Sequence, residues 1–309
     1  MTTAIDIAVP ASVGNLGPGF DALSVALQLY VRVRVLDRSG PADSIETIFT
    51  GAAPDGENAV EQAFRAARAK GGIPAPGIRV NVTADIPMRA GLGSSAAATV
   101  AGLRLYQALT SALTDDEMLA IATELEGHPD NAAACLLGGV TISCRYDDGR
   151  LVARSFPWPE RLRFVAATPQ IALGTREARA VLPRHVTLAD AVFNLQHALL
   201  LVRALEDERY DDLKEAFRDR WHQPPRAALV PGLREALRID HPSILGVCLS
   251  GSGPTIVAVA RPGHEREATL IFEDLYRSIS LPATIRVLAA HQRHAAAVGT
   301  SRLQRESTA

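Results

Sequence analysis

A stretch rich in glycine and serine, residues 87–97 (Pro-Met-Arg-Ala-Gly-Leu-Gly-Ser-Ser-Ala-Ala), has the residue types of an anion-binding loop. Gly91 and Gly93 let a backbone approach a ligand where a Cβ would clash. Ser94 and Ser95 add hydroxyls that can donate to phosphate or hold a metal ion. The flanking sequence predicts a strand before this loop and a helix after it. The loop therefore falls at a helix N-terminus, where free N–H groups and the helix dipole favour phosphate.

Other interpretations of this loop compete. A tight turn with a serine cap needs nothing beyond these residues. Gly91, Gly93 and Ala96 also satisfy the dinucleotide pattern G-x-G-x-x-G/A, and Asp115 follows about 20 residues later, where a ribose-binding acid is expected. That acid should end a second strand, yet Asp115 lies in a capping box that starts a helix. The Walker pattern fails because no Lys follows the glycines, so a phosphate clamp must use backbone, serine, arginine or metal.

Two other loops carry residues suited to ligand binding. The irregular loop at 11–21 contains Asn15 and Asp21, whose side chains can fix a ligand amine or hydroxyl, or can simply cap the turn. A Gly-Ser-Gly-Pro run at 251–254 lies between two apolar segments that read as strands. It can be a ligand loop or only a hairpin.

A third polar cluster, Glu-Leu-Glu-Gly-His-Pro-Asp-Asn at 124–131, follows a predicted helix directly. Glu124 or Glu126 can supply the carboxylate oxygen that Mg²⁺ prefers. His128 is a candidate metal ligand or base, although one His beside a Pro is typical of a turn. The alternative interpretation is a solvated helix end, with Asn131 capping the next helix.

Arginines are the remaining candidates for ligand binding. Thr175 has the character of an N-cap, and Arg179 lies one turn further along the same helix face. Two prolines precede Arg226 and should hold it in a fixed, non-helical place. A surface salt bridge is the simpler interpretation of either arginine.

The elements that must position these residues are strands and helices interleaved along the chain. The Phe-Pro-Trp-Pro run at 156–159 breaks the pattern, and we place a domain boundary there. In the long helix 187–206 we expect Val192, Leu195, Leu199 and Val202 to point inward. The predicted strands are 5–10, 31–36, 44–50, 77–87, 140–144, 163–167, 246–250, 255–260 and 284–288, and the predicted helices are 58–70, 96–109, 114–125, 187–206, 213–220 and 264–276.

Composition restricts the class of protein. The 309 residues suffice for two domains, and 47% hydrophobic with 21% charged residues is typical of a globular protein. A net charge of −2 and 5% aromatics argue against a nucleic-acid partner. The three cysteines show no metal-binding spacing and suit a reducing cytosol. With no signal pattern and no uncharged run of membrane-spanning length, we expect a cytoplasmic protein without a membrane partner.

Several of these motifs together resemble one family, the homoserine kinases of the GHMP kinase superfamily. The matching segments keep the family's order and spread over most of the chain: 10–12 with 15–21, 87–97, 126–131 and 249–255. The glycine loop marks the superfamily, whereas the Asn-Leu-Gly-Pro-Gly-Phe-Asp run and the Asp-Asn pair are closer to homoserine kinases. Val13-Gly14 replaces a common Ser-Ala pair, and Ala133 stands where proline is usual, but neither change removes a functional side chain.

The resemblance implies an α+β fold with two domains, an N-terminal domain at 1–157 that holds the nucleotide loop and a ferredoxin-like C-terminal domain at 158–300, with a polar tail at 301–309. It implies transfer of the γ-phosphoryl group of ATP to the hydroxyl of L-homoserine, on the route to threonine, with Mg²⁺ as cofactor. It is compatible with a homodimer. A kinase of another small alcohol, an NAD-dependent oxidoreductase and a non-catalytic anion-binding relative are the alternatives.

The resemblance also assigns roles to individual residues. It implies that Ser95 and Glu124 bind Mg²⁺, with Glu126 as the alternative, and that Thr175 lies near the reacting hydroxyl. Catalytic roles are implied for Asn15, Thr175 and Asp130. The implied substrate contacts are Asn15, Asp21, Asp130, Asn131, Arg179 and Arg226, and the implied nucleotide contacts are Pro87, Met88, Arg89, Ala90, Gly91, Leu92, Gly93, Ser94, Ser95, Ala96 and Ala97.

Overall fold

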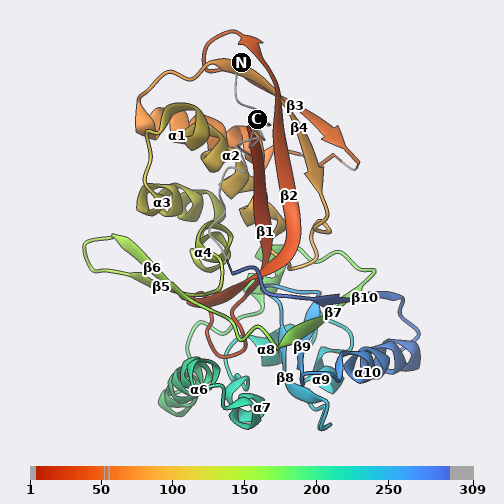
Figure 1. Cartoon of the computed structure of the whole chain (residues 1–309). Helices are drawn as coiled ribbons and strands as arrows, with labels where there is room; N and C mark the ends of the chain where they lie inside the picture. The colour runs from red at the N-terminus through yellow and green to blue at the C-terminus, as the bar shows by residue number, and fades with distance from the viewer. Residues whose placement is uncertain (1–4, 52, 55, 293–309) are drawn as a thin grey trace, which may run out of the picture.

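The computed structural model describes residues 5–51, 53–54 and 56–292. Its N-terminal half is built on one sheet with the order β3-β4-β2-β5-β6, and β1 also pairs with β2 (Figure 1). In this sheet β3 and β4 are parallel, and the other paired strands of the described residues are antiparallel. The strands are β1 (Asp6–Gly14), β2 (Leu23–Gly40), β3 (Ile45–Thr50), β4 (Gly77–Ala84), β5 (Val140–Arg145) and β6 (Leu151–Phe156).

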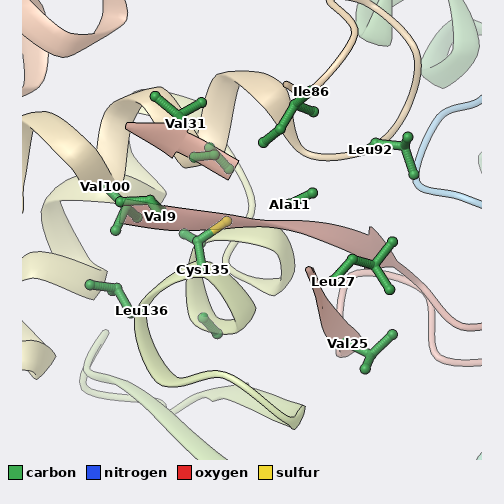
Figure 2. Packing of buried hydrophobic residues seen from close by; sticks show 14 of the residues in the cluster. Val9, Ala11, Val25, Leu27, Val31, Ile86, Leu92, Val100, Cys135 and Leu136 are labelled. Atoms are coloured by element: carbon green, nitrogen blue, oxygen red, sulfur yellow. The ribbon is translucent and has the colours of Figure 1, made fainter. Parts of the chain in front are cut away.

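Helices pack against this sheet, and their ends follow local capping rules. Asn58 caps the first of them through its side chain, and Gly72 ends it in the left-handed region. Thr114 and Glu117 form the predicted capping box of the third. Figure 2 shows side chains of β1 and of two of these helices meeting in a continuous apolar core. The helices are α1 (Ala59–Gly71), α2 (Ser94–Thr110), α3 (Asp115–Glu126) and α4 (Asp130–Leu137).

The C-terminal half is built on a four-stranded antiparallel sheet with the order β10-β7-β9-β8. Helices follow its first and third strands, so the chain order is βαββαβ and the predicted ferredoxin-like arrangement is confirmed. The strands are β7 (Arg163–Pro169), β8 (Ile244–Leu249), β9 (Ile256–Ala260) and β10 (Ala283–Leu288). The helices are α5 (Thr175–Ala180), α6 (Leu188–Glu206), α7 (Leu213–Ala216), α8 (Gln223–Arg226), α9 (Leu233–Ala236) and α10 (Glu265–Ser278), with a 3₁₀ turn η1 (Tyr210–Asp212).

The two halves share a core rather than meeting at a thin linker. One buried apolar cluster contains Val9 and Val25 of the first sheet together with Phe164 and Phe217 of the second half. The chain also returns from β10 to the first sheet, where Ala290 bridges to Leu27 of β2. The expected boundary at 157/158 falls between β6 and β7 and stays a prediction, and the predicted tail at 301–309 lies outside the described residues.

Three predictions, which concern α6, α7 and α8 in the C-terminal half, were wrong. Val192, Leu195 and Leu199 of α6 are exposed, because the opposite face, which carries Asn194, His197 and Leu201, packs inward. The predicted helix 213–220 contains only one turn, α7. Arg226 is not outside a helix either: it ends α8, whose two prolines occupy the first turn, where proline's missing N–H has no intrahelical partner.

Candidate active site

One cavity of about 610 Å³ lies between the two halves and gathers most of the residues singled out in the sequence. Its walls come from the β1–β2 loop, the glycine loop and start of α2, the turn from α3 into α4, the start of α5, α8 and the β8–β9 loop. The cavity lining includes these site residues predicted from the sequence: Asn15, Asp21, Arg89, Gly91, Gly93, Ser94, Ser95, Ala96, Asp130, Asn131, Thr175, Arg179 and Arg226.

The glycine loop is shaped by close packing against protein. Gly91 and Gly93 have φ of +79° and +68°, the left-handed region that favours glycine. A Cβ on Gly93 would come within 2.1 Å of Ser12 Oγ, and a Cβ on Gly91 within 2.5 Å of the Ser250 carbonyl oxygen. The expectation that these glycines mainly leave room for a phosphate is therefore incomplete, since each also makes room for a neighbouring strand or loop.

Neighbouring segments hold the glycine loop through its carbonyl groups. Ser12 N–H donates to the Leu92 carbonyl at 3.1 Å, and Thr255 N–H donates to the Ala90 carbonyl at 3.1 Å. The Ser250 hydroxyl donates to the Gly91 carbonyl at 2.7 Å. The segment at 249–255 is thus a hairpin loop that also supports the glycine loop.

The start of α2 has a geometry that can bind an anion. Its N-cap, Gly93, supplies no side-chain acceptor, so the first N–H groups of the helix stay available to a ligand. Ala90, Leu92 and Ala97 are buried beneath the loop and support it from the core. Pro87, Met88 and Arg89 instead line a second cavity of about 440 Å³, which shares Arg89, Ser94 and Ser95 with the first.

A carboxylate reaches this loop from the end of α3. Glu126 Oε1 accepts hydrogen bonds from the hydroxyls of Ser95 and Thr99, each at 2.8 Å, and Glu126 lines the main cavity. Glu124, the first choice in the sequence, is exposed and is not part of the cavity lining. Residues two positions apart on an α-helix point in directions that differ by about 200°, so only one of the two carboxylates, Glu124 or Glu126, can face Ser95.

Asn15 organises the first loop. It is buried, with φ of +71°, and Asp21 has φ of +56°. The Asn15 Nδ2 donates to the Gly251 carbonyl at 2.9 Å, and its Oδ1 accepts from the Asp21 N–H at 2.9 Å. The side chain therefore ties the first loop to the β8–β9 loop and sets the position of Asp21.

Asp21 and Arg179 form a two-bond ion pair across the cavity. The Arg179 Nη2 donates to Asp21 Oδ1 at 2.7 Å and its Nη1 donates to Oδ2 at 3.0 Å. Thr175, one turn before Arg179, also lines the cavity, but it begins α5 rather than capping it, since the N-cap is Gly174.

A second acidic group lies at the start of α4. Asp130 is only 2% exposed, and its Oδ1 lies 2.7 Å from His128 Nδ1. Burial lowers the pKa of His128, but the hydrogen bond and charge of Asp130 outweigh burial, so that this pKa is raised. Asn131 accepts a hydrogen bond from Ser12 at 2.8 Å.

Ligating atoms of Asp21, His128 and Asp130 all lie within 4.8 Å of one another, an arrangement that can hold a cation. Arg179 is already bonded to Asp21, so a divalent metal there would face a guanidinium at short range. We therefore favour a monovalent ammonium as the cation of this cluster.

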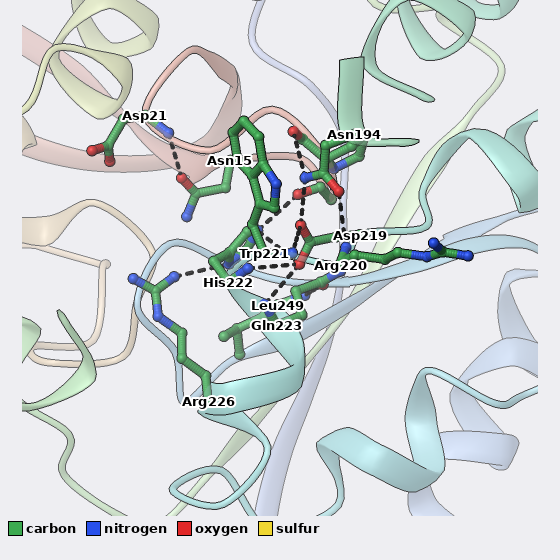
Figure 3. Close-up of polar contacts among 12 residues, drawn as sticks. Asn15, Asp21, Asn194, Asp219, Arg220, Trp221, His222, Gln223, Arg226 and Leu249 are labelled. Carbon is green, nitrogen blue, oxygen red and sulfur yellow. Dashed lines mark hydrogen bonds and ion pairs between the residues drawn. The ribbon is translucent and has the colours of Figure 1, made fainter. Parts of the chain in front are cut away.

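Arg226 is a buried cation anchored from three sides. It is 2% exposed; its Nε donates to the Ala178 carbonyl at 3.1 Å, and its Nη1 donates to the Gly251 carbonyl at 3.1 Å. The same Nη1 donates to His222 Nδ1 at 2.9 Å (Figure 3). Burial first, and then the nearby Arg179, lower the pKa of Arg226 to about 10. The guanidinium thus stays charged at neutral pH and is well placed for an anionic ligand.

His222, in its own neutral form, holds the charged Arg226 in place. Its Nε2 donates to the Gly17 carbonyl at 2.7 Å, which leaves Nδ1 as the acceptor for Arg226. Burial is the largest cause that lowers the pKa of His222, and the charge of Asp219 opposes it. Asp219 in turn accepts from the N–H groups of His222 and Gln223 at the start of α8.

This depressed pKa predicts a pH dependence of stability. A folded-state pKa below the unfolded value stabilises the fold above about pH 6.5, and this contribution is lost as the pH falls through the folded value. In urea unfolding at pH 7.5 and 5.5, the wild type should lose more stability on acidification than His222→Gln. His128, whose raised pKa acts in the opposite direction, is present in both proteins and cancels in the comparison. An equal loss of stability in the wild type and in His222→Gln would contradict a lowered pKa of His222 in the folded protein.

Sequence reasoning overlooked several residues of the site. Ser12 lies within the segment 10–12 already noted, and His222 lies just before the two prolines that precede Arg226, but their roles depend on contacts with residues 119 and 205 positions away. Phe20 was also missed; the guanidinium carbons of Arg179 and Arg226 both lie 5.4 Å from its ring centroid. The only available signal was membership in the Asn-Leu-Gly-Pro-Gly-Phe-Asp run.

Comparison with known proteins gives consistent matches. The family model of the GHMP kinases N terminal domain matches residues 58–139, and that of the GHMP kinases C terminal domain matches 201–277. A homoserine kinase of Thermus thermophilus is 42% identical over 83% of this chain and 87% of its own length. One from Desulfitobacterium hafniense is 36% identical over 95% of this chain and 100% of its own length.

The solved structures agree with the sequence relatives. The crystal structure of homoserine kinase from Cytophaga hutchinsonii superposes with a TM-score of 0.81 at 29% identity, covering 95% of this chain and 96% of that one. The glycine loop, the Asn-Leu-Gly-Pro-Gly-Phe-Asp loop and the Asp-Asn pair, which carried the resemblance in sequence, meet in one cavity of this fold. The chain belongs to the homoserine kinase family of the GHMP kinases.

Proposed function

We propose that this chain transfers the γ-phosphoryl group of ATP to the hydroxyl of L-homoserine, and that its catalytic cavity binds the two substrates in adjoining compartments. One observation supports this most strongly. A helix N-terminus open to an anion and a set of paired acids and arginines line the same cavity. The first suits a polyphosphate and the second a zwitterion. The oxidoreductase alternative is not favoured, because the relatives are kinases.

The second cavity suits the base of the nucleotide. Phe49, Ile86 and Met88 give it apolar walls, and Ser94 and Ser95 connect it to the main cavity. An adenine ring placed there would leave its phosphates over the start of α2. Backbone N–H groups and the two serines, rather than a lysine, would then bind the phosphate oxygens.

The polar end of the main cavity suits an amino acid. Asp21 and Asp130 can bind the ammonium of homoserine, and Arg179 and Arg226 can bind its carboxylate. In the structure Asp21 and Arg179 neutralise one another. If a zwitterion separates this ion pair, its ammonium can bind Asp21 and its carboxylate can bind Arg179, so each residue exchanges its bond to the other for a bond to the ligand.

The remaining predicted residues position the reaction. Asn15 holds Asp21 and the Gly251 carbonyl, Asn131 borders the same wall, and Thr175 offers a hydroxyl toward the acceptor. Phosphoryl transfer depends mainly on alignment and charge stabilisation, so these side chains can act without a dedicated base.

The residues present fit a magnesium ion. Ser95 and Glu126 bring a hydroxyl and a carboxylate together beside the phosphate loop, and hard oxygen donors are what Mg²⁺ prefers. We transfer the role proposed for Glu124 to Glu126 on this geometry. When bound, the ion would neutralise negative charge on the phosphates of ATP.

A matched pair of variants tests the metal assignment. Glu126→Gln should raise the Mg²⁺ concentration needed for half-maximal rate by about tenfold or more, because a charged ligand is lost. Glu124→Gln changes the same residue type two positions away, on the exposed face, and should leave it unchanged. Titrations of ADP release against Mg²⁺ at saturating ATP and homoserine would measure both. A larger shift for Glu124→Gln would reverse the assignment.

The proposed reaction is tested by ADP release over a panel of alcohols. We expect Mg²⁺- and ATP-dependent turnover with L-homoserine well above that with mevalonate, galactose or shikimate. Turnover of another alcohol, with none of homoserine, would overturn the proposal.

A further inference from the structure

Asp219, between α7 and α8, is a buried carboxylate to which the proposed function assigns no role. Its side chain is 0% exposed. Its Oδ1 accepts hydrogen bonds from Asn194 Nδ2 at 2.7 Å and from the Trp221 N–H at 2.9 Å. Its Oδ2 accepts from the N–H groups of His222 at 3.0 Å and Gln223 at 2.7 Å (Figure 3). These donors replace the water that a buried carboxylate loses, so the surroundings are suited to a negative charge.

Three of these donors are the backbone N–H groups that lead into α8. This helix has four residues, and the two prolines in its first turn donate no hydrogen bond. So short a helix has little stability of its own, and its place in the fold depends on contacts with the rest of the protein. Asp219 supplies such contacts at the helix start, and the Gln223 side chain supplies another by accepting from the Leu249 N–H at 2.8 Å. Asp219 therefore sets the position of α8 and of Arg226, its last residue.

Asp219 also fixes the imidazole that contacts Arg226. By accepting from the His222 N–H, the carboxylate holds that residue at the entry to α8. The His222 ring donates to the Gly17 carbonyl at 2.7 Å and accepts from Arg226 at 2.9 Å. The same ring stacks on Phe20, with 5.4 Å between the ring centroids. A displacement of Asp219 would therefore disturb both the backbone and the side-chain contacts that aim Arg226.

No carboxylate is bonded to Arg226 among the described residues: its hydrogen-bond acceptors there are two carbonyls and an imidazole, and its Nη2 has no acceptor. Burial and the charge of Arg179 lower the pKa of Arg226. The carboxylates of Asp21, Asp219 and Asp130 raise this pKa. Asp21 is already bonded to Arg179, and Asp130 to a histidine, whereas Asp219 accepts from amide groups. Asp219 can therefore favour the charged guanidinium without occupying it, which leaves Nη2 to a ligand in the cavity.

We propose that Asp219 is a positioning residue for the substrate: it holds α8 and His222 so that the guanidinium of Arg226 stays in place, charged and available to the carboxylate of homoserine. This proposal rests on the proposed function, which gives Arg226 that carboxylate as its ligand. The described residues that line the main cavity do not include Asp219, so it acts on the substrate through Arg226. A purely structural role would weaken the turnover of every alcohol alike, whereas a positioning role weakens the binding of alcohols that carry a carboxylate.

Asp219→Asn tests the proposal, because it keeps the size of the side chain but removes its charge and the acceptor capacity of one oxygen. The KM for homoserine should rise by about tenfold or more, because Arg226 loses its alignment, while kcat should fall by less than about threefold. With 3-aminopropan-1-ol, an alcohol without a carboxylate, kcat/KM should change by less than about twofold. Steady-state ADP release at saturating ATP would measure these three quantities.

A double-mutant cycle shows whether Asp219 acts through Arg226. In Arg226→Met, which lacks the guanidinium, the addition of Asp219→Asn should lower kcat/KM for homoserine by less than about twofold further. If the protein with Asp219→Asn does not fold, Asp219→Ser replaces it in both experiments, since a hydroxyl can still accept from an N–H group before α8.

Asp43→Asn is a matched control for lost hydrogen bonds to a carboxylate. Asp43 accepts from the Ala75 N–H and from Arg68 Nε, each at 2.8 Å, in the N-terminal half. This variant should lose stability in urea unfolding and keep the wild-type KM for homoserine.

The outcomes distinguish this proposal from the proposed function. A wild type that does not turn over homoserine would overturn both. With a wild type that is active on homoserine, the positioning role of Asp219 alone would be overturned by any of four results. These are an unchanged KM for homoserine in Asp219→Asn, a loss in kcat without a rise in KM, equal losses for homoserine and 3-aminopropan-1-ol, and losses that add fully in the double variant.

Discussion

Arg226→Met should lower kcat/KM for homoserine by roughly 100-fold or more, about 3 kcal/mol, the cost expected when a buried charge is removed from its anionic partner. Arg226 is buried, and three acceptors aim its guanidinium at the cavity. Arg226→Lys should recover only part of the loss, because an ammonium cannot reach all three acceptors and the ligand. Arg179→Met should cost less, roughly tenfold, because Arg179 is partly exposed and its charge is screened.

An analogue without the carboxylate provides the control. 3-Aminopropan-1-ol keeps the hydroxyl and the ammonium of homoserine, so its kcat/KM should be low but insensitive to either arginine change. The KM for ATP should change less than about threefold in each variant, since the proposed nucleotide compartment lies across the glycine loop. Equal losses for homoserine and its analogue would mean that Arg226 supports the fold or the nucleotide instead.

Gly93→Ala should weaken nucleotide binding by about tenfold or more and destabilise the protein by roughly 1–3 kcal/mol. Part of this cost comes from φ of +68°, and part from the contact of the new Cβ with Ser12 Oγ. Ser12 is buried and also donates to Asn131, so moving it disturbs the proposed substrate wall as well. Calorimetric titration with ADP and thermal unfolding would measure the two effects.

Gly263→Ala is the matched control for backbone strain. Gly263 has φ of +84°, but a Cβ there would meet nothing within 4 Å. It should lose stability through backbone conformation alone and keep its affinity for ADP. Combining Gly93→Ala with Ser12→Gly removes the colliding hydroxyl and should recover part of the affinity. If Gly263→Ala weakened ADP binding as much as Gly93→Ala does, the close contact with Ser12 would not be the cause.

Local sequence patterns identified the residues of the candidate site more reliably than they predicted the directions in which helix side chains point. The glycine loop, the Asn15–Asp21 loop and the Asp130–Asn131 pair were all visible as runs of unusual residue types, and they line one cavity. The choice between Glu124 and Glu126 could not be made, because helix rotation at the end of α3 depends on tertiary packing.

The buried face of α6 could not be predicted from the sequence for a related reason. Leucine and valine occur on several of its faces, so periodicity alone cannot say which face is buried. The decisive residues are polar: Asn194 and His197 find partners on the protein and draw that face inward. The conformation of Asn15 was equally inaccessible, since its φ of +71° is supported by a carbonyl 236 residues away.

That carbonyl has a consequence for how the enzyme is made. The Gly251 oxygen accepts from Asn15 near the start of the chain and from Arg226 in the C-terminal half, while Ser250 and Thr255 support the glycine loop. During synthesis the ribosome completes the glycine loop long before these supports emerge. A nascent chain that ends before β8 therefore has the glycine loop without the contacts that shape it. Nucleotide binding should begin only after β9 has left the exit tunnel, which makes ATP a ligand of the finished fold rather than an early folding template.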